Sequence, residues 1–186
     1  MKEGMKKLII ILLAVGVIGS IIFTGCTQSS ALEERVQTLE DIQAITVIRA
    51  EYCYYADTGD WQKEAALFTD DAVCDFGPFG YYEGKAAITE FFRDLMPAGM
   101  DMTLHMVHNQ KVEVNGDTAT GEWYYEVPYT TVDNQAGWIA GKYFEEYVRV
   151  DGEWKFKKVV ADWYWNTPYE KGWAVEGMIK DPSPGN

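Results

Sequence analysis

Two histidines, His105 and His108, stand three residues apart in the stretch TLHMVHNQ, and the chain has no others. An imidazole can move protons near neutral pH or bind a metal ion. The residues around the pair alternate as in a β-strand, where positions i and i+3 point to opposite faces. The spacing therefore does not favour a shared metal site. We expect one histidine to face the interior and the other to face away.

Three further residues are of types that could act with an imidazole in proton transfer. Tyr52 lies on the apolar stripe of a predicted helix, and Asp57 follows five residues later at its end. A phenol can hold an oxyanion, and a carboxyl in apolar surroundings can carry protons. Glu126 lies on a predicted strand, where most carboxylates face water.

The first half of the domain has helical periodicity. Apolar residues recur every three or four positions from Leu32 to Tyr55, which predicts an amphipathic helix that ends near DTGD, at Thr58 and Gly59. A short helix is expected from Trp61 to Phe68, then a strand, a Gly/Pro turn and a second strand. Another helix is expected over 85–96, stopped by Pro97.

The second half alternates with period two. The residues MTLHMVHNQKVEV, 102–114, predict one long strand, and three more strands follow, two of the connections being the tight turns NGD and DG. The order predicts an α+β fold, with one curved antiparallel sheet wrapped on three N-terminal helices. Five aromatic residues on these strands either pack the core or form a cup for a flat apolar ligand: Trp123, Tyr125, Trp138, Tyr143 and Trp163.

The N-terminus reads as a targeting segment. The basic head MKEGMKK precedes an uncharged apolar run from Leu8 to Phe23, short for a membrane span. The residues FTGC, 23–26, resemble the end of a bacterial lipoprotein signal, in which the cysteine, here Cys26, becomes the lipidated N-terminus. The alternative is an uncleaved anchor. Both readings place the domain outside the cytoplasm, tethered to the membrane.

These features divide the chain into a signal (1–25), a tether (26–31), one domain (32–170) and a C-terminal tail (171–186). Cys53 and Cys74 lie in the domain, as a disulfide or as two buried thiols. The net charge of −13 makes nucleic acid a poor candidate partner.

The order of the motifs resembles the SnoaL-like branch of the NTF2-like superfamily. The resemblance rests on YCYYADTGDWQKEAALFTDDAV, GPFGYYEGKAAITEFF, TLHMVHN and VDGEWKFKKVVADW. Within this branch the motifs are similar to those of bile-acid 7α-dehydratase and, more distantly, scytalone dehydratase. The resemblance implies a cone-shaped fold and catalytic roles for Tyr52, Asp57 and His105. A second family carboxylate, which supports the histidine, falls on Val127, with Glu126 beside it. Either Glu126 takes this catalytic role through a bulge, or the activity is absent or altered.

Three functions follow from this resemblance. The first is a dehydratase or isomerase that needs no cofactor or metal and acts on a small, apolar, hydroxylated ring compound. The second is a tethered module that binds such a compound without chemistry. The third is assembly, because domains of this superfamily commonly form homo-oligomers, often dimers, through the open sheet face.

Overall fold

The computed structural model describes the backbone of residues 2–177 and the side chains of residues 30–177. The chain forms two compact units, residues 1–41 and 42–186, and helix α1 (Lys2–Thr58) contributes to both. In the described part of the chain, no helix is both long and apolar enough to cross a membrane. The side chain of Cys26 and residues 178–186 of the predicted tail lie outside the described residues.

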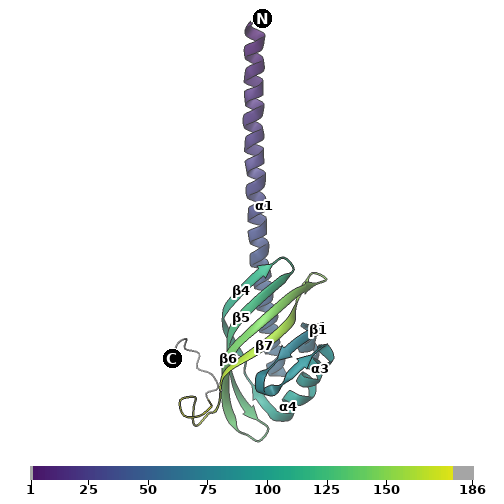
Figure 1. Ribbon diagram of the computed structural model, residues 1–186, viewed down its shortest axis with the longest axis vertical. Helices are drawn as coiled ribbons and strands as arrows, with labels where there is room; N and C mark the ends of the chain where they lie inside the picture. The colour runs from purple at the N-terminus through teal and green to yellow at the C-terminus, as the bar shows by residue number, and fades with distance from the viewer. Residues whose placement is uncertain (1, 178–186) are drawn as a thin grey trace. The chain divides into compact units, whose positions relative to one another are not determined.

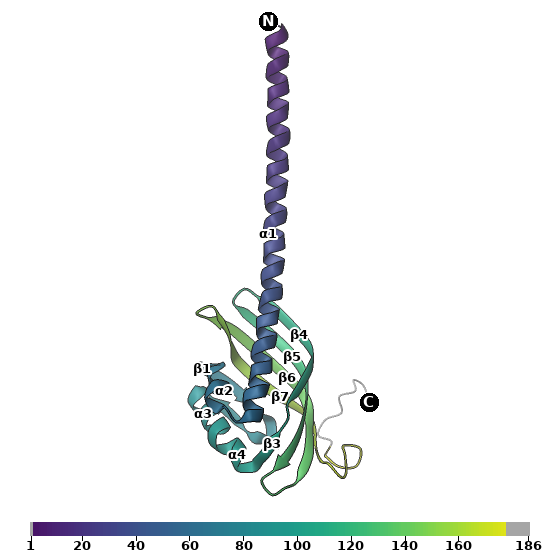
Figure 2. The ribbon, with the colours of Figure 1, turned by 180° about the vertical axis from the view of Figure 1, so that it is seen from behind.

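The second unit contains a layer of helices and one large sheet (Figures 1 and 2). The helical segments after α1 are α2 (Trp61–Ala66), the 3₁₀ turn η1 (Gly77–Phe79), α3 (Lys85–Glu90), the π-helical η2 (Phe91–Leu95) and α4 (Met96–Gly99). The strands are β1 (Phe68–Asp75), β2 (Tyr81–Glu83), β3 (Met100–Thr103), β4 (Met106–Asn115), β5 (Thr118–Thr131), β6 (Ala136–Val150) and β7 (Glu153–Pro168).

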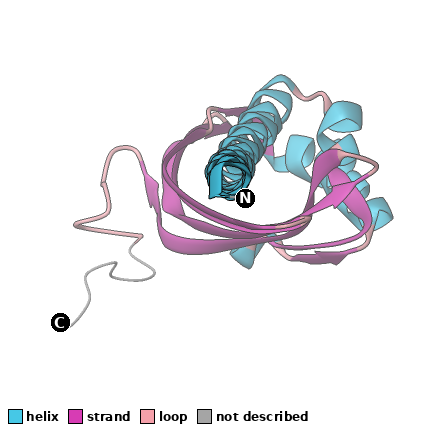
Figure 3. Ribbon diagram, turned by 90° about the horizontal axis from the view of Figure 1, so that it is seen from above, coloured by secondary structure: helices cyan, strands magenta, loops and turns pink. Residues whose placement is uncertain are grey.

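The sheet confirms the predicted α+β class. Its order is β2-β1-β7-β6-β5-β3, with β4 also paired to β5, and it curls around a concave face (Figure 3). All pairings are antiparallel except that of β1 with β7. This parallel pair, which needs a long connection, makes the sheet mixed rather than purely antiparallel. The predicted turns are present, with positive φ at Gly116, Asp151 and Gly152.

The strand predicted over residues 102–114 is interrupted, which corrects the sequence prediction. β3 ends at Thr103 and β4 begins at Met106. The break faces Pro128 of β5, which has no N–H to donate; the Leu104 N–H donates to the Pro128 carbonyl at 3.0 Å. The next N–H, that of His105, donates to the Asp57 carboxylate of α1. The interruption therefore joins the end of α1 to the sheet.

The end of α1 is set by local sequence. Gly59 has a φ of 69°, the left-handed conformation that stops a helix and that glycine adopts without strain. Asp60 then caps α2, because its side chain accepts a hydrogen bond from the Lys63 N–H. The predicted helix end at Thr58 and Gly59 is thus confirmed, and it fixes the position of Asp57 one residue earlier.

A buried ion pair joins α1 to the concave face of the sheet. Arg49 Nη1 lies 2.9 Å from Glu145 Oε1, and both side chains are at most 1% exposed. The guanidinium carbon lies 4.3 Å from the ring centre of Tyr52 and 4.1 Å from that of Tyr143. Tyr147 donates its hydroxyl hydrogen to the second Glu145 oxygen. The cluster therefore holds the helix against β6 at one defined position.

Replacing Arg49 by Met should reduce the free energy of unfolding by about 3–5 kcal/mol, because the Glu145 charge would be left buried without its partner. Arg93→Met is the matched control, since the Arg93–Asp94 pair is about half exposed and should contribute less than about 1 kcal/mol. Urea unfolding followed by tryptophan fluorescence measures both, because all seven tryptophans lie within residues 61–173. Equal losses in the two variants would contradict a structural role for the buried pair.

Candidate active site

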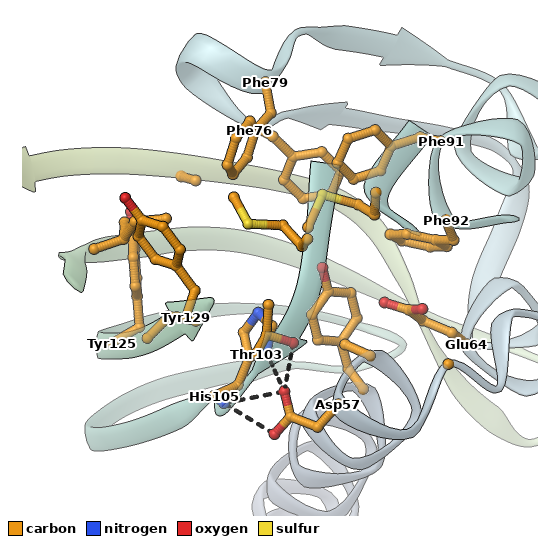
Figure 4. A pocket seen from close by; sticks show the side chains of 18 of the residues that line it. Asp57, Glu64, Phe76, Phe79, Phe91, Phe92, Thr103, His105, Tyr125 and Tyr129 are labelled. Carbon is orange, nitrogen blue, oxygen red and sulfur yellow. Dashed lines mark hydrogen bonds and ion pairs between the residues drawn. The ribbon is translucent and has the colours of Figure 1, made fainter. Parts of the chain in front are cut away.

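A cavity of about 300 Å³ opens between the end of α1, the short helical segments and the concave face of the sheet (Figure 4). Most of its wall is apolar. Aromatic residues from both the helical layer and the sheet line the cavity together with three methionines: Tyr52, Phe76, Phe79, Phe91, Phe92, Tyr125, Tyr129, Tyr143, Trp163, Met96, Met100 and Met102. Such a wall suits a flat, apolar, ring-containing ligand.

Asp57 and His105 form the polar part of this wall. His105 Nδ1 lies 2.6 Å from Asp57 Oδ1, and the two side chains are 11% and 18% exposed. The same carboxylate accepts hydrogen bonds from the His105 N–H, at 2.9 and 3.1 Å, and from the Thr103 hydroxyl at 3.1 Å. A carboxylate held by so many donors has one orientation, and so does the imidazole bound to it.

The hydrogen bonds also determine where the imidazole carries its proton. An ionised carboxylate can only accept, so the Nδ1 of neutral His105 must donate to Asp57. The lone pair then lies on Nε2, at the opposite edge of the ring. His105 lines the cavity, and Figure 4 shows the ring extending from Asp57 into it. The arrangement therefore presents a proton-accepting nitrogen to whatever occupies the cavity.

Tyr52 lies next to this pair. Its ring is edge-on to the imidazole, with centroids 6.3 Å apart, and it is 4% exposed. Burial, reinforced by the nearby Glu64 carboxyl, raises the pKa of Tyr52 well above that of an ordinary phenol. The hydroxyl therefore stays protonated at neutral pH and can donate a hydrogen bond. The structure thus brings together three of the predicted residues, Tyr52, Asp57 and His105, at one cavity.

Glu126, the fourth predicted catalytic residue, is not part of the cavity. Its carboxylate lies on the outer face of the sheet, 3.8 Å from His108, and both side chains are almost half exposed. Side chains alternate along β5, so Glu126 points away while Val127 lines the cavity. Glu126 therefore does not support His105. The supporting carboxylate is Asp57, from the helix rather than from the neighbouring strand.

Two of the five predicted pocket aromatics lie elsewhere, whereas Tyr125, Tyr143 and Trp163 line the cavity. Trp123 faces inward but belongs to the deeper core, beside Tyr147. Side chains alternate along β6, so Trp138 faces outward while its neighbour Ile139 lines the cavity. The centre of the Trp138 ring lies 6.3 Å from that of Trp173 and 6.4 Å from that of Tyr169.

Glu64 of α2 is a lining residue that the sequence reasoning missed. It is only 4% exposed, and burial raises the pKa of its carboxyl to about 8. A signal was present in the sequence: Trp61, Glu64, Ala65 and Phe68 recur at helical spacing, which places Glu64 on the apolar face of α2. A carboxyl on such a face is a candidate for a functional group.

The remaining reactive side chains do not form a second centre within residues 30–177. Cys53 and Cys74 are buried free thiols rather than a disulfide, and burial raises the pKa of each. No group of three or more His, Cys, Asp or Glu side chains in this range is arranged to hold a metal ion. The structure contains one chain, and the predicted homo-oligomer stays a prediction.

The sequence profile of the SnoaL-like domain matches residues 37–160. The chain belongs to the SnoaL-like domain family. The matched region contains Tyr52, Asp57, Glu64 and His105. The fold of the chain is the NTF2-like cone that was predicted from the order of the motifs.

Solved structures of three other proteins have the same fold. A protein from Novosphingobium aromaticivorans, provisionally named a scytalone dehydratase, has a TM-score of 0.68 at 23% identity, over 79% of this chain and 97% of its own. A type 2 hexachlorocyclohexane dehydrochlorinase has a TM-score of 0.67 at 26% identity, over 80% and 97%. A second N. aromaticivorans protein, provisionally named an aromatic ring hydroxylase, has a TM-score of 0.65 at 30% identity, over 70% and 94%. A ligand-binding or catalytic role is therefore plausible for this SnoaL-like domain.

Proposed function

We propose that this SnoaL-like domain is a lyase or isomerase that works with side chains alone on an apolar, ring-containing compound. The observation that carries the proposal is the contact between Asp57 and His105 at the wall of an aromatic cavity. The contact orients an imidazole as a general base. The cavity supplies a water-poor space that fits a ring.

The chemistry begins with removal of a proton from a carbon next to a carbonyl group. His105 Nε2 takes the proton, and Asp57 stabilises the imidazolium that forms, in the way a buried carboxylate supports a catalytic histidine. The negative charge moves to the carbonyl oxygen. Tyr52 donates its phenolic hydrogen to that oxygen, which lowers the energy of the enolate. In an elimination, the enolate electrons form the new C=C bond while the hydroxyl group on the next carbon takes up a proton and leaves as water. In an isomerisation, the proton instead returns to another carbon.

Two of the similar structures support an elimination. One is provisionally named a dehydratase and the other a dehydrochlorinase, and both names denote loss of a small molecule from neighbouring carbons. The two reactions share the removal of a proton by a base, and they differ in the group that leaves. A positioned base beside an apolar cavity is what both require.

Loss of water from a panel of hydroxylated, steroid-like and polyketide-like cyclic ketones, followed by mass spectrometry with the full chain, tests the proposal. We expect turnover of at least one compound and a decrease of about 10²–10⁴-fold in rate for His105→Ala and Asp57→Asn, because general base catalysis is lost. His108→Ala is the matched control and should retain the rate, since His108 lies on the outer face.

A ligand that is retained by the wild-type chain and by His105→Ala, without water loss from any compound, would contradict the lyase. It would instead support the alternative of a SnoaL-like binding module that captures an apolar ring compound and releases it unchanged.

We further propose that the domain is extracytoplasmic and anchored to the cell membrane as a lipoprotein. The basic head, the uncharged run from Leu8 to Phe23 and the residues up to Cys26 support this location. Lipid on Cys26 would tether the domain to the membrane surface, where apolar ring compounds concentrate.

In bacteria fed an alkyne-bearing fatty acid, the wild-type chain should acquire the label and lose residues 1–25, and Cys26→Ser should acquire none. Cys53→Ser is the control and should keep the label, because Cys53 is buried inside the domain. An unlabelled wild-type chain that still carries its first 25 residues would indicate an uncleaved anchor instead.

A further inference from the structure

Besides Asp57, two acidic residues line the cavity, the exposed Asp101 and the buried Glu64, and neither the base nor its support uses Glu64. It lies in α2, on a wall separate from the Asp57–His105 contact, and Figure 4 shows its carboxyl directed into the cavity. Among residues 30–177, its carboxyl has no hydrogen-bond or ion-pair partner. A buried carboxyl without a partner is unfavourable for folding, so its position at a cavity points to a ligand.

The groups around Glu64 determine its charge. Arg49, Tyr52 and Asp57 face it from α1, and Cys74 faces it from β1. Burial raises the pKa of Glu64, the positive charge of Arg49, which is also paired with Glu145, lowers it, and the negative charge of Asp57 raises it. Burial is the largest influence, and the pKa of about 8 leaves the carboxyl mostly neutral at pH 7. A neutral carboxyl donates a hydrogen bond, which a carboxylate cannot do.

We propose that Glu64 is the proton-donating group of the cavity and that the ligand presents an oxygen atom, a hydroxyl or a carbonyl, to it. This inference deepens the proposed function and rests on it for the catalytic step. It selects oxygenated ring compounds over halogenated ones, because a departing chloride needs no proton, whereas a departing hydroxyl does.

In the elimination, the base and the acid act on neighbouring carbons. His105 Nε2 takes the proton from carbon, the C–H electron pair forms the new C=C bond, and the C–O bond breaks. Glu64 gives its proton to the departing oxygen, so water leaves and Glu64 becomes a carboxylate. Transfer of the proton from the His105 imidazolium to Glu64, directly or through water, restores both groups. No oxidant, reductant or further reactant is required.

Binding of two matched probes tests the role of Glu64 without any turnover. The probes are 1-tetralone, a bicyclic ketone, and tetralin, the same ring system without oxygen; tryptophan fluorescence of the full chain reports their binding, because Trp163 lines the cavity. The wild type should bind tetralone about 10-fold more tightly than tetralin, since one hydrogen bond from a buried donor contributes about 1.4 kcal/mol.

Three variants separate hydrogen bonding from packing. Glu64→Leu should weaken the preference for tetralone to what the Tyr52 hydroxyl contributes, and Glu64→Gln should keep it, because an amide N–H donates as well. The wild-type preference should decline from about pH 7 to about pH 9 as the carboxyl ionises, whereas that of Glu64→Gln should not. Glu83→Gln is the surface control and should behave as the wild type, since Glu83 is exposed on β2. A preference that is unchanged in Glu64→Leu and independent of pH would overturn the proposal.

A separate kinetic measurement tests the acid role of Glu64, so that a failure of this role can be distinguished from a failure of the proposed function. On a compound that the wild type dehydrates, Glu64→Gln should bind normally but lose about 10²-fold or more in kcat, because an amide cannot supply the proton. The analogue with chloride in place of the hydroxyl should react at similar rates in both proteins. An equal loss of kcat with the hydroxyl and chloride leaving groups would overturn the acid role of Glu64. A wild-type protein that turns over none of the compounds would overturn the lyase, and the binding of the two probes would then decide the role of Glu64.

Discussion

The site depends on one carboxylate that is shared between a helix and the sheet. Asp57 lies at the last turn of α1 and accepts hydrogen bonds from the Thr103 hydroxyl, the His105 N–H and the His105 imidazole. The first two contacts hold the interruption between β3 and β4 against the helix, and the third orients the ring. Because all three end on the same group, the position of the strand break and the direction of the imidazole are determined together.

The position of Asp57 depends in turn on how α1 is held inside the cone. The Arg49–Glu145 pair fixes the helix against β6, and Gly59 stops it two residues beyond Asp57. In the resulting cavity, the Asp57–His105 contact lies on one wall and Glu64 lies on another. Two proton-active groups on different walls, separated by aromatic surface, are suited to opposite halves of one elimination, because one takes a proton and the other gives one.

Local pattern predicted much of this structure, and tertiary contacts account for what it missed. Helical spacing and the residues DTGD predicted α1 from Leu32 onwards and its end, and strand alternation correctly separated His105 from His108. The break at His105 could not be predicted, because the N–H leaves the sheet for Asp57, a residue 48 positions away. The burial of Arg49 was missed for the same reason, since its partner Glu145 is 96 residues distant and looks in sequence like one more strand carboxylate on a wet face.

The protonation of the His105 ring tests the central claim most directly, because it requires no substrate. The full chain, labelled with ¹⁵N-histidine and held at alkaline pH, gives separate nitrogen signals, which His108→Asn assigns. The account predicts that His105 carries its hydrogen on Nδ1, bound to Asp57, with a bare Nε2 facing the cavity, and that Asp57→Asn redistributes the hydrogen between the two nitrogens. A wild-type His105 protonated on Nε2, or unchanged in Asp57→Asn, would contradict a base positioned by Asp57.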